Sequence, residues 1–172
     1  MAVFHRLAHR FFALGAGLSM ALVFGIIFVN SLRRYTIGKS LEWGEELPIY
    51  LTVYGVMFGV ALAYLQDRHI RFTILTDFLS QRARSRLFAA VDLATVAIGV
   101  TLAWSGVLFA TRRGAVEASG LIGTAKALAQ STGAEWLVHL GRMGTWQSAM
   151  VFGGTILAIA AAIRFATRIR EV

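Results

Sequence analysis

The sequence contains no cysteine and only one proline among its 172 residues. Without cysteine, the chain cannot form disulfides, thiolate metal sites or cysteine nucleophiles. The one proline, Pro48, stands at the start of an apolar stretch. The sequence therefore lacks the matched Gly/Pro-interrupted half-helices that mark a midplane substrate site in transporters. It also shows no nucleophile–base pair and no phosphate-binding glycine loop, so we expect neither an enzyme nor an autonomous transporter.

Charged residues are missing from four long stretches, which cover residues 11–32, 47–66, 93–111 and 143–163. Each stretch is long enough to cross a bilayer as a helix, and none shows the polar face of a soluble helix. The first is too long for a signal peptide and lacks a small-x-small cleavage site, so we expect it to be retained. The predicted fold is an all-α integral membrane protein, a single four-helix domain over residues 1–172, with spans at about 11–33, 47–66, 87–111 and 143–166.

The basic residues predict the orientation of these spans. The net charge of +8 is spread over the ends of the spans and forms no single stripe, which argues against a nucleic-acid partner. Ten of the 17 Lys and Arg residues fall on the side of the two termini and seven on the other, so the positive-inside rule places both termini in the cytoplasm. Trp43, Trp136 and Trp146 then lie at the outer boundary and Trp104 in the outer half of its span, as expected for residues that favour the interface with membrane lipids.

The outer loop before the last span, residues 114–142, has the pattern of an amphipathic segment. Leu121, Ile122, Ala125, Leu128 and Ala129 fall on one face of a helix. We expect this segment to lie against the outer membrane surface or against a partner. The alternative is a partly ordered loop.

The histidines do not indicate a cofactor. His5, His9, His69 and His139 all lie outside the predicted spans, whereas a haem held by a four-helix bundle needs histidines on facing helices. His5 and His9 share a helix face but have no third ligand nearby, so we expect interfacial anchoring and no metal. We therefore predict no cofactor.

One carboxylate, Asp92, lies near the beginning of the third span. A carboxylate within a span is expensive and usually has a function. We expect a structural ion pair with Arg86 or with the basic residues Arg68–Arg71. Proton or ion coupling through Asp92 is the alternative.

Small residues recur at helical spacing in three of the spans. In lipid such stripes let helix backbones approach closely, which either packs the helices of the chain together or docks a partner. The three stripes are Gly17, Ala21 and Gly25; Gly55, Gly59 and Ala63; and Gly154, Ala158 and Ala162.

The most specific pattern lies around the second span, where an acidic cluster precedes the uncharged stretch and a histidine within a basic patch follows it. The motif consists of Glu45-Glu46, Tyr50, Gly55, Gly59, Ala63 and His69-Ile70, preceded by Arg33, Ser40 and Trp43. It resembles the small membrane subunit, of DctQ type, of tripartite ATP-independent periplasmic (TRAP) transporters. The length, the four spans and the longer outer loop before the last span agree with that family.

The resemblance implies a multi-pass protein of the bacterial inner membrane that works with two partners. A large DctM-type membrane subunit would hold the substrate and sodium sites and move by an elevator-like mechanism. A soluble periplasmic solute-binding protein would deliver an organic acid. This chain would be a scaffold without a substrate site of its own, with structural or subunit-interface residues at Arg33, Trp43, Glu45, Glu46, Tyr50, Gly55, Gly59 and His69.

The most specific hypothesis concerns Glu45 and Glu46. One or both would hold the outer end of the second span by pairing with Arg33, with Arg34 or with a basic group of a partner. Adjacent residues of a helix point about 100° apart, so the two side chains should not be equivalent. The alternative is that both are solvated interface residues.

Two other functions stay open at this point. The chain would be the membrane anchor of a different complex, such as a respiratory enzyme, if haem or quinone purified with it. It would be a small dimeric exporter if the purified chain transported by itself.

Overall fold

The structure, a computed structural model, describes residues 2–66 and 78–170. Four of its helices are long and apolar enough to cross a membrane: α1 (Ala2–Ile37), α2 (Trp43–Leu65), α4 (Gln81–Arg113) and α6 (Met143–Arg170). A short helix, α5 (Ile122–Thr132), and a 3-10 helix, η1 (Glu135–Gly141), connect α4 to α6. The predicted fold class, an all-α membrane protein with four spanning helices, is confirmed. His69 and the patch Arg68–Arg71 lie outside the described residues.

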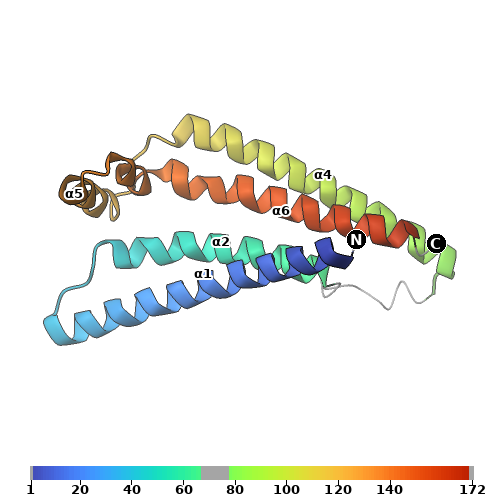
Figure 1. Cartoon of the computed structure of the whole chain (residues 1–172), viewed down its shortest axis with the longest axis horizontal. Helices are drawn as coiled ribbons and strands as arrows, with labels where there is room; N and C mark the ends of the chain where they lie inside the picture. Colours follow the sequence, from blue (N-terminus) through green and yellow to red (C-terminus); the bar gives the residue numbers. More distant parts are fainter. Residues whose placement is uncertain (1, 67–77, 171–172) are drawn as a thin grey trace.

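The four long helices form two antiparallel pairs, α1 with α2 and α4 with α6 (Figure 1). The two pairs meet through α2 and α6. Both termini lie at one end of the bundle, which we call the terminal end, and α5 lies at the other, which we call the α5 end (Figure 1). The two termini therefore face the same side of a membrane that the helices cross.

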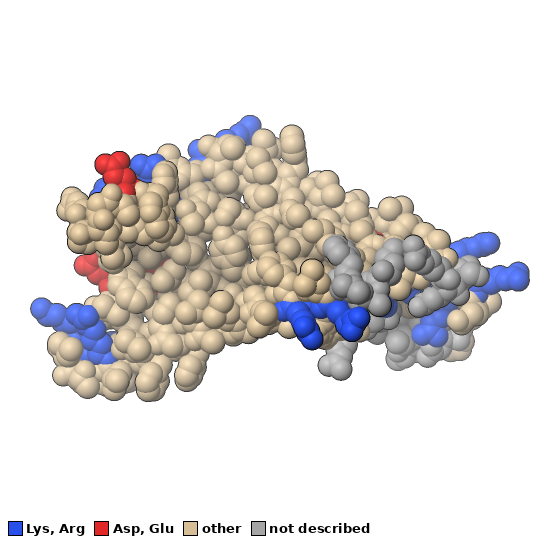
Figure 2. All heavy atoms as spheres, viewed as in Figure 1, with Lys and Arg blue, Asp and Glu red and all other residues tan. Residues whose placement is uncertain are grey.

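The long helices exceed the thickness of a bilayer core. Helix α1 has 36 residues and α4 has 33, whereas about 20 residues rising 1.5 Å each cover the 30 Å of hydrocarbon. Helices α1 and α4 are thus longer than the hydrocarbon layer requires. Figure 2 shows a mostly tan surface with Lys and Arg side chains in several separate groups, among them groups at the left and at the right of the view. The precise limits of each span within its helix stay a prediction.

Local signals explain where several helices begin and end. Helix α1 ends at Gly38, which has a φ of 75°, and α5 ends at Gly133, which has a φ of 70°. A side chain is strained in that left-handed conformation, so glycine is the residue that suits both positions. Helix α4 begins after Ser80, whose hydroxyl accepts a hydrogen bond from the Ala83 amide at 3.4 Å.

Helices α4 and α6 pack with their backbones in near contact. A methyl group built on Gly99 would lie 2.7 Å from the Gly154 carbonyl oxygen, and one on Gly154 would lie 2.5 Å from the Ala103 amide nitrogen. Two turns further along α4, a methyl group on Gly106 would lie 2.7 Å from the Val151 amide nitrogen of α6. Gly154 and Ala158 of the small-residue stripe in the last span are thus used to pack the chain against itself, whereas Ala162 of the same stripe is exposed.

The other two stripes are only partly used in this way. Gly55 is buried and faces Ser19 and Met20 of α1, where an added methyl group would come within 2.4 Å of the Met20 side chain. Gly17, Gly25 and Gly59, in contrast, have no atom of the described residues within 4 Å of an added methyl group. Packing among the residues that the structure describes does not require their small size.

The hydrophobic core lies where the two helix pairs meet, toward the terminal end. It is formed by buried residues of α1, α2 and α6, namely Phe12, Ala61, Leu65, Ile156, Ala160 and Ile163. Phe58 and Phe152 pack edge to face beside this core at a centroid distance of 5.3 Å. The interface that joins the pairs therefore combines aromatic, aliphatic and small residues.

The connection between α4 and α6 is ordered and amphipathic, as the sequence predicted. Leu121, Ala125 and Ala129 are buried, whereas the neighbouring Lys126 is exposed. The prediction was wrong for Leu128, which was placed on the same face but is 47% exposed. The 3-10 helix η1 packs against α5, because a methyl group on Gly141 would lie 2.8 Å from Ile122. The alternative of a partly ordered loop does not hold for this segment.

Candidate functional site

Glu46 links the first turn of α2 to the segment before α5. Its Oε2 accepts a hydrogen bond from the Gly120 backbone amide at 2.7 Å, and its Oε1 accepts one from the Tyr50 hydroxyl at 2.5 Å. The carboxylate is half-buried and lies near the N-terminus of α2, where the helix dipole favours negative charge. We call Glu46, Tyr50, Gly120 and Trp146 the Glu46 junction.

The two neighbouring glutamates have different surroundings. Glu45 is exposed, whereas Glu46 forms the two hydrogen bonds of the junction. Arg33 and Arg34 are exposed at the end of α1, and no ion pair joins either arginine to Glu45 or Glu46 within the described residues. The structure thus gives Glu46 a role inside the chain, while the pairing of Glu45 with a partner stays a prediction.

Tyr50 extends the junction to α6. Its ring stacks on the indole of Trp146 at a centroid distance of 5.3 Å with an interplanar angle of 12°, and its hydroxyl lies 3.1 Å from the sulfur of Met143. The Trp146 Nε1 donates to the Leu140 carbonyl oxygen of η1 at 3.0 Å. Three elements are therefore connected through one tyrosine and one tryptophan. Trp43 and Trp146 together line an apolar hollow of about 290 Å³ beneath α5.

Asn30 is a structural residue that sequence reasoning missed. It is buried near the end of α1, and its Oδ1 accepts a hydrogen bond from the Leu41 amide at 2.7 Å. A methyl group on Gly44 would lie 2.8 Å from the Asn30 side chain, so the first turn of α2 packs directly on it. The only signal in the sequence is a polar amide at the end of an uncharged stretch, which does not say what it binds.

Tyr54 was missed for the same reason. Its hydroxyl donates to the Thr145 carbonyl oxygen at 2.8 Å and lies 2.8 Å from the Ser148 hydroxyl. It joins α2 to α6 one turn below Tyr50. The sequence shows a tyrosine in an apolar stretch, whereas the partner, 91 residues away, is visible only in the fold.

At the terminal end, Asp92 is the centre of a second polar group. Asp92 is 1% exposed, its Oδ2 accepts a hydrogen bond from the Arg168 Nε at 2.8 Å, and its Oδ1 accepts one from the Tyr64 hydroxyl at 2.7 Å. The Arg168 guanidinium also lies over the Phe88 ring, 5.0 Å from its centroid. We call Asp92, Tyr64, Arg168 and Phe88 the Asp92 cluster.

The ion pair predicted for Asp92 is therefore present, but its described partner differs from the expected ones. Arg168 of α6 takes the place expected for Arg86. The sequence separation of 76 residues explains the miss, because nothing local indicates which basic residue the fold brings to Asp92. The pair joins α4 to α6, and the bond to Tyr64 adds α2.

His9 is a described histidine that bonds to another helix. The His9 Nε2 lies 2.7 Å from the Gln66 Nε2, which ties the beginning of α1 to the end of α2. No group of three His, Cys, Asp or Glu side chains with metal-binding geometry occurs in the part of the chain that the structure describes.

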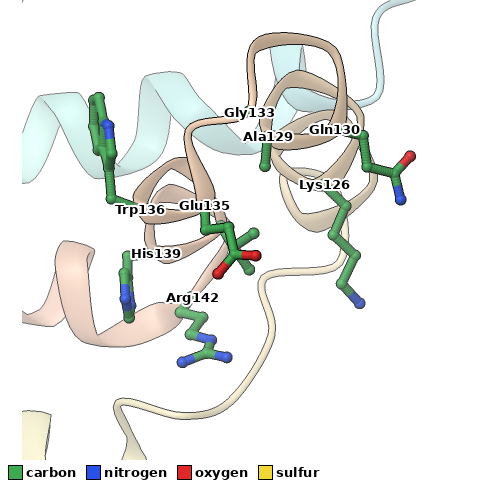
Figure 3. Close-up of a pocket in the computed structure, with 9 residues that line it drawn as sticks. Lys126, Ala129, Gln130, Gly133, Glu135, Trp136, His139 and Arg142 are labelled. Carbon is green, nitrogen blue, oxygen red and sulfur yellow. The ribbon is translucent and has the colours of Figure 1, made fainter.

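A polar hollow of about 720 Å³ lies between α5 and η1 (Figure 3). Its charged lining has both signs, with Lys126 and Arg142 against Glu135. Lys126 also forms an ion pair with Glu117 at 2.9 Å, in which both side chains are about half exposed. The hollow is an open, mixed-charge surface of the α5 end, which fits contact with water or a polar protein surface better than a single anion.

Glu46 bonds to the segment before α5, and Asp92 connects α4 to α2 and α6, at the two ends of an apolar bundle. This arrangement defines a helix-bundle membrane protein in which these two carboxylates bond within the chain. The family model for "Tripartite ATP-independent periplasmic transporters, DctQ component" matches residues 23–171. The chain belongs to the DctQ family of TRAP transporter subunits.

Three relatives agree with this assignment. One segment is 27% identical over 84 residues to the sialic acid TRAP transporter small permease protein SiaQ of Vibrio cholerae, covering 48% of this chain and 49% of that protein. Another is 26% identical over 74 residues to a putative TRAP transporter small permease protein of Haemophilus influenzae, covering 43% of this chain and 46% of the relative. A third is 34% identical over 71 residues to the sialic acid TRAP transporter permease protein SiaT of H. influenzae, covering 41% of this chain and 11% of SiaT. The aligned segments span about half of these relatives or less.

Proposed function

We propose that this chain is the small transmembrane scaffold subunit of a sodium-coupled, binding-protein-dependent TRAP transporter of the bacterial inner membrane. It supports a large DctM-type subunit that carries the substrate and sodium sites. A periplasmic solute-binding protein delivers the solute. Both termini face the cytoplasm, so the α5 end faces the periplasm.

The proposal rests on one observation: buried and half-buried polar side chains bond to other parts of the same chain. Glu46, Tyr50 and Tyr54 bond within the chain at the α5 end, and Asp92 bonds with Arg168 at the terminal end. A solute site in a transporter needs polar groups that converge on a cavity near the midplane. Here those groups connect helices to one another, as a supporting subunit requires.

The relative SiaT supports the association with a larger permease. The segment similar to this chain makes up 11% of that protein. A permease of much greater length thus contains a portion that resembles this chain. We infer that the present chain contacts a separate large subunit in an equivalent way.

The proposed solute is an organic acid. Two of the relatives are named for sialic acid, which carries a carboxylate at neutral pH. Sialic acid is therefore the first solute to test, and other carboxylates follow.

The test is reconstitution in liposomes with an inward sodium gradient. We expect uptake of radiolabelled solute when this chain, the large subunit and the binding protein are all present, and no uptake with this chain alone. Uptake by the lone chain would overturn the scaffold role and favour the exporter alternative. Haem or quinone in the purified chain would favour an anchor of a different complex.

A further inference from the structure

At the terminal end, a hollow of about 420 Å³ lies between the first turns of α4 and the last turn of α6. Its lining combines three arginines with apolar and hydroxyl side chains: Arg82, Ser85, Arg86, Ala89, Arg168 and Ile169. We infer that this hollow binds the phosphate headgroup of an anionic phospholipid. The site is separate from the Glu46 junction and does not depend on the proposed transport function.

The charges of the hollow favour an anion. Arg168 is neutralised by its ion pair with Asp92, which is itself 1% exposed. Arg82 and Arg86 are exposed, and within residues 2–66 and 78–170 no ion pair of either one is described. They stand four residues apart on α4, so they project from the same face of the helix. Two exposed positive charges, neither paired with a carboxylate among the described residues, therefore remain at the opening of the hollow.

The rest of the lining favours a lipid over a free phosphate ion. Ala89 is half-buried, and Ile169 is 55% exposed beside it. An inorganic phosphate would gain nothing from this apolar wall, whereas an acyl chain would cover it. Ser85 adds a hydroxyl that can donate a hydrogen bond to a phosphate oxygen.

The position along the helices agrees with a headgroup site. Arg82 and Arg86 directly precede the predicted span 87–111, and Ile169 follows the predicted span 143–166. The hollow therefore lies at the boundary between water and lipid. Basic pockets between transmembrane helices at that depth bind anionic headgroups.

The test uses the full chain purified in detergent, titrated with phosphatidylglycerol and, separately, with phosphatidylethanolamine of the same acyl chains. Bound lipid is measured by native mass spectrometry. We expect phosphatidylglycerol to bind more tightly than phosphatidylethanolamine, and inorganic phosphate in excess not to displace it. Equal binding of both lipids, or displacement by inorganic phosphate at low concentration, would overturn the proposal.

The arginines are tested by Arg82→Gln, Arg86→Gln and the double change. Each single change should weaken phosphatidylglycerol binding about fivefold and the double change about 30-fold, since an interfacial arginine contributes about 1 kcal/mol toward an anionic lipid. The matched control is the double change Arg112→Gln and Arg113→Gln, which removes two exposed arginines from the other end of the same helix. Equal loss in both double variants would show general attraction to a basic protein and would refute a specific site.

Arg82 and Arg86 also contribute to the positive-inside bias, so the double variant is open to insertion in the wrong orientation. A variant that keeps both charges therefore provides a second test. Ala89→Phe fills the hollow without removing a charge. It should lower phosphatidylglycerol binding at least fivefold while the helical content and the unfolding temperature stay close to wild type. Unchanged lipid binding in Ala89→Phe would contradict the placement of the lipid in this hollow.

Discussion

The two ends of the bundle hold a carboxylate in different ways. At the α5 end, Glu46 is half-buried and accepts hydrogen bonds from two neutral donors, the Tyr50 hydroxyl and the Gly120 amide. At the terminal end, Asp92 is buried and binds the cationic Arg168 as well as the Tyr64 hydroxyl. Both carboxylates thus receive a hydroxyl from α2, but only the buried one is paired with an opposite charge.

The difference follows from the cost of removing a charge from water. A carboxylate that keeps part of its hydration can be held by neutral donors, whereas one without hydration needs a compensating cation. The comparison predicts that the same kind of substitution costs more in the Asp92 cluster than in the Glu46 junction.

The largest effect is expected for Asp92→Ala, which leaves the Arg168 guanidinium, whose side chain is 15% exposed, without its partner. Breaking a buried ion pair costs about 3–5 kcal/mol. The measurement is the free energy of unfolding of the purified chain in mixed micelles. The double change Asp92→Ala with Arg168→Leu should recover part of this loss, and a double variant less stable than Asp92→Ala would contradict the explanation.

A smaller effect is expected for Glu46→Ala, which leaves the Gly120 amide and the Tyr50 hydroxyl without their acceptor. Because Glu46 is half-buried, water can replace part of the lost hydrogen bonding, so we expect the free energy of unfolding to fall by about 1–3 kcal/mol. The matched control is Glu45→Ala, an exposed change on the adjacent residue that should stay within about 0.5 kcal/mol of wild type. Equal losses of stability for the two glutamate variants would show that the junction does not depend on Glu46.

The same two variants also test whether Glu45 contacts a partner. The measurement is recovery of the complex with the large subunit.

The two tyrosines test the two carboxylate sites separately. Tyr50→Phe removes the hydroxyl that binds Glu46, and Tyr64→Phe removes the one that binds Asp92, while both keep the ring. A hydrogen bond to a charged group contributes about 1.5–3 kcal/mol. We expect the loss of stability in Tyr64→Phe to lie near the upper limit of this range, since Asp92 is buried. The loss in Tyr50→Phe should lie near or below the lower limit. Thermal unfolding of both variants against wild type measures the difference. A larger loss for Tyr50→Phe would reverse the proposed order of the two ends.

The smallest effect on stability is expected from single cysteines that report which side of the membrane each end faces. Ser131→Cys at the α5 end and Gln81→Cys at the terminal end replace exposed residues, so each should change stability by less than about 0.5 kcal/mol. With both termini cytoplasmic, a membrane-impermeant thiol reagent added to intact cells should label position 131. Position 81 should react only after the cells are opened. The native chain has no cysteine and provides the blank, and the reversed pattern would overturn the orientation.

The fold class and the amphipathic segment could be predicted because their signals are local. Long uncharged stretches indicate spanning helices, and helical spacing indicates the buried residues Leu121, Ala125 and Ala129, although it also included Leu128, which is exposed. The family resemblance likewise rests on residues close together in the sequence, and the match over residues 23–171 confirms it. The roles of the individual motif residues stay predictions, and the contacts described here say where each of them lies.

The number of spanning helices, the order of the elements and the non-equivalent directions of two adjacent glutamates could thus be predicted from the residues alone. Which residues meet is visible only in the fold: Arg168 with Asp92, Gly120 with Glu46, and Gly55 but not Gly59 against another helix. An apolar helix in lipid has no polar face that would mark its inner side. Its rotation and register are therefore decided by close packing between segments far apart in the chain.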